Sequence, residues 1–308
     1  MSIIQTLCSF NEEAMSTDQF FGVIPPTTTP FSAEGEILYN QLGAQIDWMV
    51  GSGVHGICVG GSSAEGHTLD ANELQRLLET SRDVLAGRVP LIAGIIINST
   101  RQAVDRSKMA REAGAVALQV TPPHYVFRPS DDALVDHFRA IADESGLPVL
   151  IYNVVPWCYL GPALLKRIMT EVPGVIGVKQ SNSDLKLTAD LMLDLPEGKL
   201  VFTAVDALLY PSFALGVHGT IAANPAAAPK AVVKLWDLVK EGKHTEAKAL
   251  HADLLRFWNA LITDDLPANI KYAQSLQGVP FALPRAPMKA PDEARKALIA
   301  DALKAIPH

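Results

Sequence analysis

Residues 130–153 read SDDALVDHFRAIADESGLPVLIYN, and this stretch contains the unit that decides the fold. Ser130 is a favourable N-cap, the apolar residues of Asp131–Glu144 recur at helical spacing, and Gly146 marks the end of the predicted helix. The run Pro148–Asn153 follows at once, and its short apolar sequence is typical of a buried strand. A helix followed directly by a buried strand is the repeating unit of proteins with parallel sheets.

The same alternation of strand and helix recurs along the chain. The predicted strands are Gly22–Pro26, Gly56–Gly60, Pro90–Ile97, Ala115–Thr121, Pro148–Asn153, Val175–Lys179, Leu200–Ala204 and Gly219–Ala223. The predicted helices between them are Leu38–Val50, Ala71–Leu85, Arg101–Ala113, Asp131–Glu144 and Ala163–Glu171. Eight strands that alternate with helices favour a parallel sheet closed into a barrel. We therefore predict an α/β fold, a (β/α)8 TIM barrel.

An open, doubly wound sheet is the alternative topology. It usually carries a Gly-rich turn after the first strand, whereas Pro25–Pro30 reads PPTTTP here. From Pro229 onward, predicted helices follow one another without strands; they are Ala231–Lys240, Thr245–Leu261, Ala268–Leu276 and Pro291–Ala305. The predicted organisation is a lead-in over residues 1–19, the barrel over 20–228, and the last barrel helix with a small C-terminal helical module over 229–308.

The composition excludes several classes of protein. Of 308 residues, 48% are hydrophobic and 19% are charged, which excludes wholesale disorder. The net charge of −7 makes nucleic acid and anionic membrane surfaces unfavourable partners. The first basic residue is Arg76, so the chain lacks the basic start of a secretory signal, and its three cysteines cannot all pair. We therefore expect a cytoplasmic protein.

The carboxyl ends of the strands are where a barrel of this kind carries its active site. Lys179 ends an apolar run that begins at Val175, so its side chain is predicted to leave a packed strand at the barrel mouth. Desolvation there favours loss of its proton, and the free amine would form a Schiff base with a ketone. The alternative is an ion-paired lysine that holds the barrel rim, and position alone does not decide between the two.

Two further strand ends carry hydroxyl groups. Tyr152 ends another apolar strand and would relay protons to and from an imine if a neighbouring hydroxyl holds its phenol. Ser62 and Ser63, in the Gly-rich loop after the second strand, are suited to supply that neighbour or to bind a substrate carboxylate. The alternatives are a rim tyrosine with its hydroxyl in water, and a flexible turn.

A metal site is not predicted. Glu65 and His67 stand two residues apart, as two ligands can, but no third ligand stands at a typical spacing. His124 is a further possible ligand, and His55 lies at the start of its predicted strand rather than at its end. We therefore expect chemistry that uses side chains alone.

Taken together, these segments resemble one family. Gly61–Gly66 (GSSAEG), Tyr152-Asn153 and Gly177–Lys179 (GVK) occur in the order found in the dihydrodipicolinate synthase / N-acetylneuraminate lyase family. Gly216–Ile221 (GVHGTI) and Asp206 also match the entry to that family's eighth strand and the turn after its seventh. The resemblance covers the predicted barrel and the helical tail.

The resemblance implies a class I lyase that needs neither a metal nor an organic cofactor. Lys179 matches the lysine that forms an imine with pyruvate or another 2-oxo acid, and Tyr152 matches the tyrosine that shuttles protons. Ser63 matches the hydroxyl residue that links this tyrosine to a second one, and Ser62 matches its neighbour at the substrate carboxylate. Ile221 matches a residue whose backbone faces the pyruvyl group.

The resemblance also implies a homotetramer, a dimer of dimers, in which the second tyrosine reaches across the dimer interface. We expect that tyrosine to be Tyr125, with His124 as the alternative. Synthases of dihydrodipicolinate carry an arginine shortly after Tyr-Asn, and the segment Val154–Leu160 has none. Trp157 and Tyr159 in that segment favour a bulkier or aromatic second substrate.

The leading hypothesis is a Schiff-base lyase that acts on pyruvate or a related 2-oxo acid, together with an aldehyde or sugar-acid co-substrate. In this hypothesis the imine forms on Lys179 and the proton relay runs through Tyr152, while cleavage, synthesis and dehydration all stay open as the net reaction. The alternative within the family is 4-hydroxy-tetrahydrodipicolinate (dihydrodipicolinate) synthase itself. Alternatives of other classes are a non-catalytic regulator that binds a 2-oxo acid and a metal-dependent aldolase.

Overall fold

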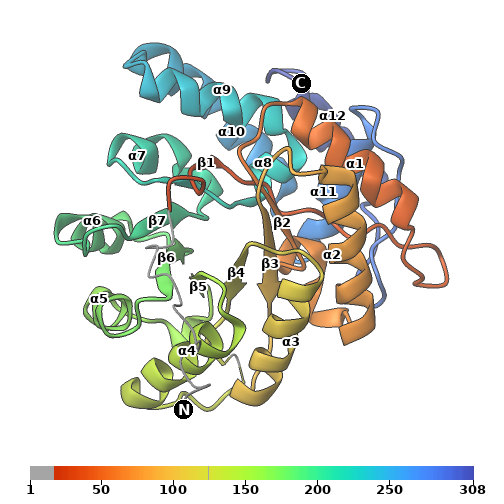
Figure 1. The fold of residues 1–308 in the computed structure, drawn as a ribbon. Coiled ribbons are helices and arrows are strands. Elements are labelled where there is room, and N and C mark those ends of the chain that lie inside the picture. Colours follow the sequence, from red (N-terminus) through yellow and green to blue (C-terminus); the bar gives the residue numbers. More distant parts are fainter. Residues whose placement is uncertain (1–16, 124) are drawn as a thin grey trace, which may run out of the picture.

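The computed structural model describes residues 17–123 and 125–308. Eight parallel strands form one sheet in the order β1-β8-β7-β6-β5-β4-β3-β2, and helices lie outside it (Figure 1). The strands are β1 (Gly22–Val23), β2 (Ile57–Val59), β3 (Leu91–Ile95), β4 (Ala117–Val120), β5 (Val149–Asn153), β6 (Val175–Gln180), β7 (Leu200–Thr203) and β8 (Gly219–Thr220). Each strand lies within its predicted run, except that β6 continues one residue past Lys179.

The sheet closes between β1 and β2 without a regular ladder. The residues after β1 meet β2 at a single parallel bridge between Pro26 and Cys58. The backbone N–H of Cys58 donates to the carbonyl of Pro25 (3.0 Å), and the N–H of Thr27 donates to the carbonyl of Cys58 (2.8 Å). Because Pro25 and Pro26 have no N–H to contribute, the ladder stops early on this strand. The predicted (β/α)8 TIM barrel is confirmed.

Helices cover the outside of the barrel, and local capping fixes where several of them begin. The helices that alternate with the first strands are α1 (Tyr39–Gly51), α2 (Ala71–Leu85), α3 (Thr100–Glu112), α4 (Asp131–Ser145) and α5 (Pro162–Glu171). Asp70 and Glu73 form a reciprocal capping box at the start of α2. Ser130 accepts a hydrogen bond from the backbone N–H of Ala133 at the start of α4, as its N-cap position predicts.

Three helices after β6 are absent from the sequence prediction. They are α6 (Leu185–Leu193), α7 (Leu209–Ala214) and α8 (Ala223–Ala227). In α6 (LKLTADLML) apolar residues occur on all sides although only Thr188 and Leu191 are buried, so no single apolar face stands out in the sequence. The other two have six and five residues and each contains a proline, which leaves too few positions for a period to show.

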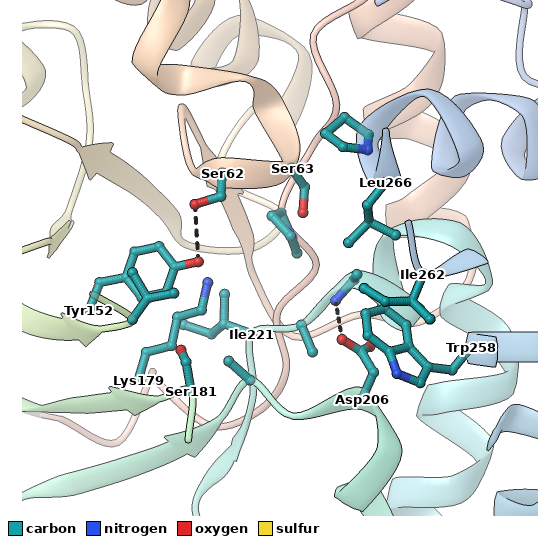
Figure 2. Close-up of a pocket in the computed structure, with 16 residues that line it drawn as sticks. Ser62, Ser63, Tyr152, Lys179, Ser181, Asp206, Ile221, Trp258, Ile262 and Leu266 are labelled. Carbon is teal, nitrogen blue, oxygen red and sulfur yellow. Dashed lines mark hydrogen bonds between the residues drawn. The ribbon is translucent and has the colours of Figure 1, made fainter. Parts of the chain in front are cut away.

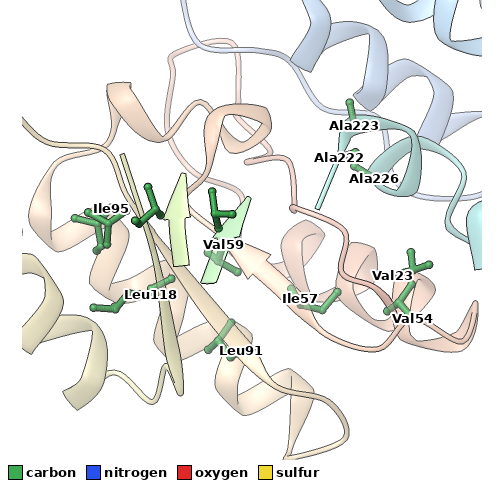
Figure 3. Packing of buried hydrophobic residues seen from close by; sticks show 14 of the residues in the cluster. Val23, Val54, Ile57, Val59, Leu91, Ile95, Leu118, Ala222, Ala223 and Ala226 are labelled. Atoms are coloured by element: carbon green, nitrogen blue, oxygen red, sulfur yellow. The ribbon is translucent and has the colours of Figure 1, made fainter. Parts of the chain in front are cut away.

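Apolar side chains fill both the inside of the barrel and the layer between strands and helices. The inner cluster consists of Phe20, Ile24, Cys58, Ile92, Ala117, Leu150, Ile176, Leu200, Phe202 and Ile221. Figure 3 shows part of the outer cluster, in which Ile57 and Val59 of β2 and Leu118 of β4 are buried. Because the barrel interior is packed, a ligand finds space above the strand ends and not inside the barrel.

The C-terminal helices follow one another without strands and pack on the barrel. They are α9 (Pro229–Lys240), α10 (His244–Leu261), α11 (Leu266–Ser275) and α12 (Glu293–Leu303). Buried polar contacts anchor α11, where Gln274 Oε1 accepts hydrogen bonds from Thr28 Oγ1 (3.1 Å) and from Gln45 Nε2 (3.2 Å). Since buried polar groups are costly without partners, these contacts hold α11 at the barrel mouth. Within the described residues, no helix combines the length and the apolar composition that a membrane crossing requires.

Candidate active site

A pocket of about 390 Å³ opens at the carboxyl ends of the strands (Figure 2). It is lined by the loop after β2, the ends of β5 and β6, the turns after β7 and β8, and the α10–α11 region. The pocket brings together five of the six predicted site residues: Ser62, Ser63, Tyr152, Lys179 and Ile221.

Lys179 enters the pocket from β6, where it pairs in register with Tyr152 of β5. The residue is 4% exposed, and its Nζ lies 3.7 Å from the centroid of the Tyr152 ring. The nitrogen therefore faces an aromatic ring inside a pocket. A buried ion pair belongs to another lysine, Lys271, whose Nζ lies 2.6 Å from Glu65 Oε1. Lys179 Nζ thus lies against an aromatic ring in the pocket lining, and the buried ion pair is made by a different lysine.

The phenol of Tyr152 contacts one of the two serines in the loop after β2. Its hydroxyl lies 3.1 Å from Ser62 Oγ, and either group is able to donate this hydrogen bond (Figure 2). Of the two serines expected as candidates for this contact, Ser62 makes it, whereas the family resemblance implied Ser63. The reason is the short 3-10 turn Ser62–Ala64, which directs Ser62 toward β5 and places Ser63 farther along the pocket wall.

The loop that carries these serines is held from several sides. Glu65 adopts the left-handed conformation at φ 54°, and a Cβ on Gly66 would come within 2.0 Å of the Gly60 carbonyl oxygen. Thr29 Oγ1 donates to the carbonyl of Ala64 over 2.7 Å. The buried Glu65 side chain also pairs with Lys271 of α11, so the C-terminal helices fix the serine loop.

Asp206, in the turn after β7, is the second charged residue among those that line the pocket. Its carboxylate accepts hydrogen bonds from the backbone N–H groups of Ala223 (3.1 Å) and Asn224. Burial raises the pKa of this carboxyl to about 6, although the two N–H groups and the Lys179 ammonium act in the opposite direction. Asp206 thus joins the turns after β7 and β8 and places a carboxyl group within electrostatic reach of Lys179.

Ile221 follows β8 and is fully buried in the pocket lining. Its backbone N–H donates to the carbonyl of Thr203 over 3.0 Å. That N–H is therefore already engaged before any ligand binds.

The remaining predicted aromatic residues lie away from Lys179. Tyr125 is 63% exposed on the loop after β4, and its carbonyl accepts a hydrogen bond from Trp157 Nε1 (2.8 Å). Trp157 is itself 54% exposed, and Tyr159 lines a neighbouring pocket with Ser181. Neither Trp157 nor Tyr159 lines the lysine pocket, so these two residues do not support the bulkier or aromatic second substrate for which they were cited. His124 lies outside the described residues.

Two of the residues considered as metal ligands have other contacts. Glu65 pairs with Lys271, and His55 Nδ1 accepts a hydrogen bond from the backbone N–H of Val23 (3.0 Å). In the part of the chain that the structure describes, no three His, Cys, Asp or Glu side chains gather as a metal site requires.

One wall of the pocket was missed by the sequence analysis. Trp258 of α10, Ile262 just after it and Leu266 at the start of α11 face the pocket (Figure 2). Pro267 of α11 lines it as well. Helix α10 ends at Leu261 and α11 begins at Leu266, so these residues do not share one helical face. No local pattern in the sequence therefore marks this wall, which lies outside the barrel repeat in which site residues were sought.

Comparisons with known proteins agree on one family. The chain matches the model of the Dihydrodipicolinate synthetase family over residues 19–306. It is 32% identical to a 4-hydroxy-tetrahydrodipicolinate synthase of Methanopyrus kandleri, over 93% of this chain and 96% of that protein. It is 30% identical to the Bacillus subtilis protein of the same name, over 87% of this chain and 93% of the relative.

Solved structures give the same result. One similar structure is YagE of E. coli K12, a prophage protein belonging to the dihydrodipicolinic acid synthase family, in complex with pyruvate. Its TM-score is 0.88 at 28% identity, over 93% of this chain and 98% of that one. Another is a putative dihydrodipicolinate synthetase from Pseudomonas aeruginosa, with a TM-score of 0.89 at 28% identity, over 93% and 99% of the two chains. These matches extend over the C-terminal helices that wall the pocket as well as over the barrel.

Proposed function

Because the chain belongs to the Dihydrodipicolinate synthetase family, whose enzymes are lyases of the class I aldolase type, we propose that Lys179 forms a Schiff base with pyruvate or a related 2-oxo acid. The observation that carries this proposal is the position of one buried amine. Lys179 Nζ lies in the pocket 3.7 Å from the ring of Tyr152, whose hydroxyl contacts Ser62. A nucleophile and a proton-transfer group therefore share one small space.

The proposed reaction proceeds through an imine and an enamine. The amine of Lys179 attacks the ketone carbon, and loss of water gives the imine. The protonated imine accepts the electron pair that remains when C3 loses a proton, which yields the enamine. The enamine carbon then attacks an aldehyde carbon, whose oxygen takes up a proton, and water releases the product and the free lysine. Cleavage of the product follows the same steps in reverse.

Tyr152 is proposed to carry the protons in this sequence. Its hydroxyl is held by Ser62 at 3.1 Å, and the centroid of its ring lies 3.7 Å from the nitrogen that forms the imine. A hydroxyl held in this way gives up a proton to the substrate and regains one through its hydrogen-bond partner. Ser62 is thus assigned to the relay.

Ser63 is assigned to the carboxylate of the 2-oxo acid. It lines the pocket beside Ser62, and the 3-10 turn of residues 62–64 begins at this point (Figure 2). Hydroxyl groups and free backbone N–H groups at the start of a turn are suited to bind a carboxylate. The assignments of Ser62 and Ser63 are therefore the reverse of those expected from the sequence.

Trapping with borohydride tests the Schiff base. Incubation with pyruvate and borohydride is expected to add the mass of a carboxyethyl group to the wild-type protein. The same gain is expected in Lys186→Ala, which removes an exposed lysine of α6, but not in Lys179→Ala. Absence of the adduct from the wild type contradicts the proposal. Stabilisation by pyruvate without an adduct would favour the non-catalytic regulator instead.

A second candidate, 4-hydroxy-tetrahydrodipicolinate synthase proper, is supported by the names of the curated relatives. Against it, the segment Val154–Leu160 contains no arginine to bind the carboxylate of a second substrate. Incubation with pyruvate and aspartate semialdehyde decides between the two candidates, since the synthase consumes the two substrates together. The rate of their consumption is measured. We expect slow consumption.

The proposal includes a homotetramer in the cytoplasm. Tyr125 and Phe127 lie in contact on an exposed loop, and their apolar rings fit a surface that a second copy covers. Tyr125 would then complete the proton relay from the neighbouring copy. The buried free thiols of Cys58 and Cys158 agree with a reducing compartment. Sedimentation of the wild type against Tyr125→Asp tests the assembly, which is expected to dissociate in the variant.

A further inference from the structure

The pocket around Lys179 has two chemically different sides. Lys179, Tyr152 and Ser62 stand together on one side, and Trp258, Ile262 and Leu266 stand opposite them (Figure 2). The first side carries the proposed chemistry. The second side is built from the α10–α11 region and offers one aromatic and two aliphatic side chains; Trp258 and Leu266 are half-buried, and Ile262 is 44% exposed at the rim. We call these three residues, with Pro267, the apolar wall.

No cation in the described lining of the pocket is free to bind a second carboxylate. Its charged residues are Lys179, which forms the imine in the proposed function, and Asp206. Asp206 is an anion or a neutral acid, and its oxygens already accept hydrogen bonds from Ala223 and Asn224. A carboxylate-bearing co-substrate would therefore lose its water without gaining a charged partner, which is unfavourable.

Two described segments of the rim near the pocket do not supply a cation either. The segment that follows β5, Val154–Leu160, contains no lysine or arginine. Arg128, on the loop after β4, donates to Asp131 over 2.7 Å at the surface and does not line the pocket. The charges around the pocket thus disfavour a co-substrate that carries a carboxylate, and the apolar wall favours a co-substrate with an apolar body.

Ser181 offers the pocket a polar group that is available to a ligand. Ser181 Oγ is buried and makes no hydrogen bond within the described structure, although Ser181 lines the pocket two residues after Lys179. A hydroxyl at that position is suited to bind the oxygen of an aldehyde or of the alcohol that forms from it. The pocket therefore offers a polar contact for one oxygen and an apolar surface for the rest of the molecule.

From these observations we infer that the co-substrate is an aldehyde with an aromatic or branched apolar body and no carboxylate. This inference rests on the proposed function, because the aldehyde reacts with the enamine on Lys179. The carbonyl carbon forms the new bond to C3 of the 2-oxo acid, its oxygen is protonated near Ser181, and the apolar body packs against Trp258 and Leu266. The product is a 4-hydroxy-2-oxo acid with an apolar substituent.

A comparison of two aldehydes as co-substrates tests the inference. The wild-type enzyme is given pyruvate with benzaldehyde or with succinic semialdehyde, and kcat/KM is measured from pyruvate consumption and product mass. We expect a preference of about 10-fold or more for benzaldehyde, because burial of an aromatic ring against apolar surface is favourable and an unpaired carboxylate is not. Equal use of the two aldehydes, preference for the acidic one, or consumption of neither overturns the inference.

Two variants locate the effect in the apolar wall. Trp258→Ala is expected to raise KM for benzaldehyde about 10-fold, since a large apolar contact is lost, while the borohydride adduct with pyruvate still forms. Ile262→Arg supplies the missing cation and is expected to shift the preference toward succinic semialdehyde. Leu298→Arg, at a 56% exposed position of α12 outside the pocket, is the matched control and should leave the preference unchanged.

The outcomes separate this inference from the proposed function. Loss of the pyruvate adduct from the wild type contradicts the Schiff base itself. An adduct that forms normally, combined with a preference that neither Trp258→Ala nor Ile262→Arg changes, contradicts the apolar wall alone.

Discussion

Lys179 Nζ lies 3.7 Å from the centre of the Tyr152 ring, and the two residues occupy paired register positions on neighbouring strands, β6 and β5. Parallel strands point paired residues to the same side of the sheet, so the barrel itself brings these two side chains together. The ring covers the amine while the hydroxyl at its far end contacts Ser62. In the proposed mechanism the ring and the hydroxyl of this tyrosine therefore have separable functions.

Substitution of Tyr152 separates those functions. Tyr152→Phe keeps the ring beside Lys179 and removes the hydroxyl, so we expect the borohydride adduct to form while turnover falls about 100-fold to 10,000-fold, as for loss of an acid–base group. Tyr152→Leu removes both and should also slow adduct formation. Adduct yield by mass spectrometry and kcat by pyruvate consumption are the measurements. Unchanged kcat in Tyr152→Phe would remove Tyr152 from the proton relay.

The two serines of the loop after β2 are expected to give different kinetic effects. Ser62→Ala removes the partner of the Tyr152 hydroxyl and should lower kcat with little change in KM for pyruvate. Ser63→Ala should raise KM for pyruvate about fivefold, the loss of one ordinary hydrogen bond to the carboxylate, with a smaller effect on kcat. The opposite pattern would restore the assignment that the sequence suggested.

The buried pair Glu65–Lys271 is expected to control stability. Removal of one partner leaves a buried charge without compensation, so Lys271→Met should lower the free energy of unfolding by about 3–5 kcal/mol. The double variant Glu65→Gln, Lys271→Met should recover part of this loss, because no uncompensated charge remains. Lys186→Met breaks an exposed pair with Asp190 and should leave the free energy of unfolding nearly unchanged. Urea unfolding of the four proteins compares these values.

His137 is expected to make stability depend on pH. It is buried on α4 with Nδ1 2.9 Å from Thr100 Oγ1, and burial lowers its pKa from 6.5 to about 4. Because the folded state disfavours the charged ring, the contribution of His137 to the free energy of unfolding is fully present above pH 6.5. It is lost as the pH falls toward 4, by about 3 kcal/mol in total. The raised pKa of Asp206 acts with the opposite sign, since its protonation favours the folded state as pH falls from about 6.

A variant isolates the contribution of His137. His137→Asn keeps a polar group near Thr100 but does not titrate, while Asp206 contributes equally to both proteins. The difference in unfolding free energy between wild type and variant, measured at pH 7 and at pH 4.5, should therefore shift against the wild type at the lower pH. A difference that is constant across this range would contradict the assignment.

The sequence was sufficient to predict the strands and most of the helices, because buried strands and capped amphipathic helices leave strong local patterns. Ala71–Leu85 forms the predicted helix with the capping box of Asp70 and Glu73. Helices α7 and α8 left no such pattern, since each is too short for a helical period. Local sequence patterns were thus enough to predict the barrel, whereas the short helices were found only in the structure.

The site was predictable to the extent that it lies on strand ends. Lys179 and Tyr152 follow directly from the barrel, because a residue at the carboxyl end of a strand lies at the mouth. The order of Ser62 and Ser63 was not predictable, since a single 3-10 turn decides which hydroxyl faces β5. Trp258 is placed by the packing of α10 and α11 on the mouth, which is a long-range relationship that no local pattern specifies.

The most direct test of the central claim is the location of the trapped pyruvate. The protein is treated with pyruvate and borohydride, digested, and sequenced by tandem mass spectrometry. The account predicts a carboxyethyl group on the Nζ of Lys179 and none on Lys271, the other buried lysine of the barrel mouth. A modification found on Lys271 instead, or spread over exposed lysines while Lys179 stays unmodified, would contradict it.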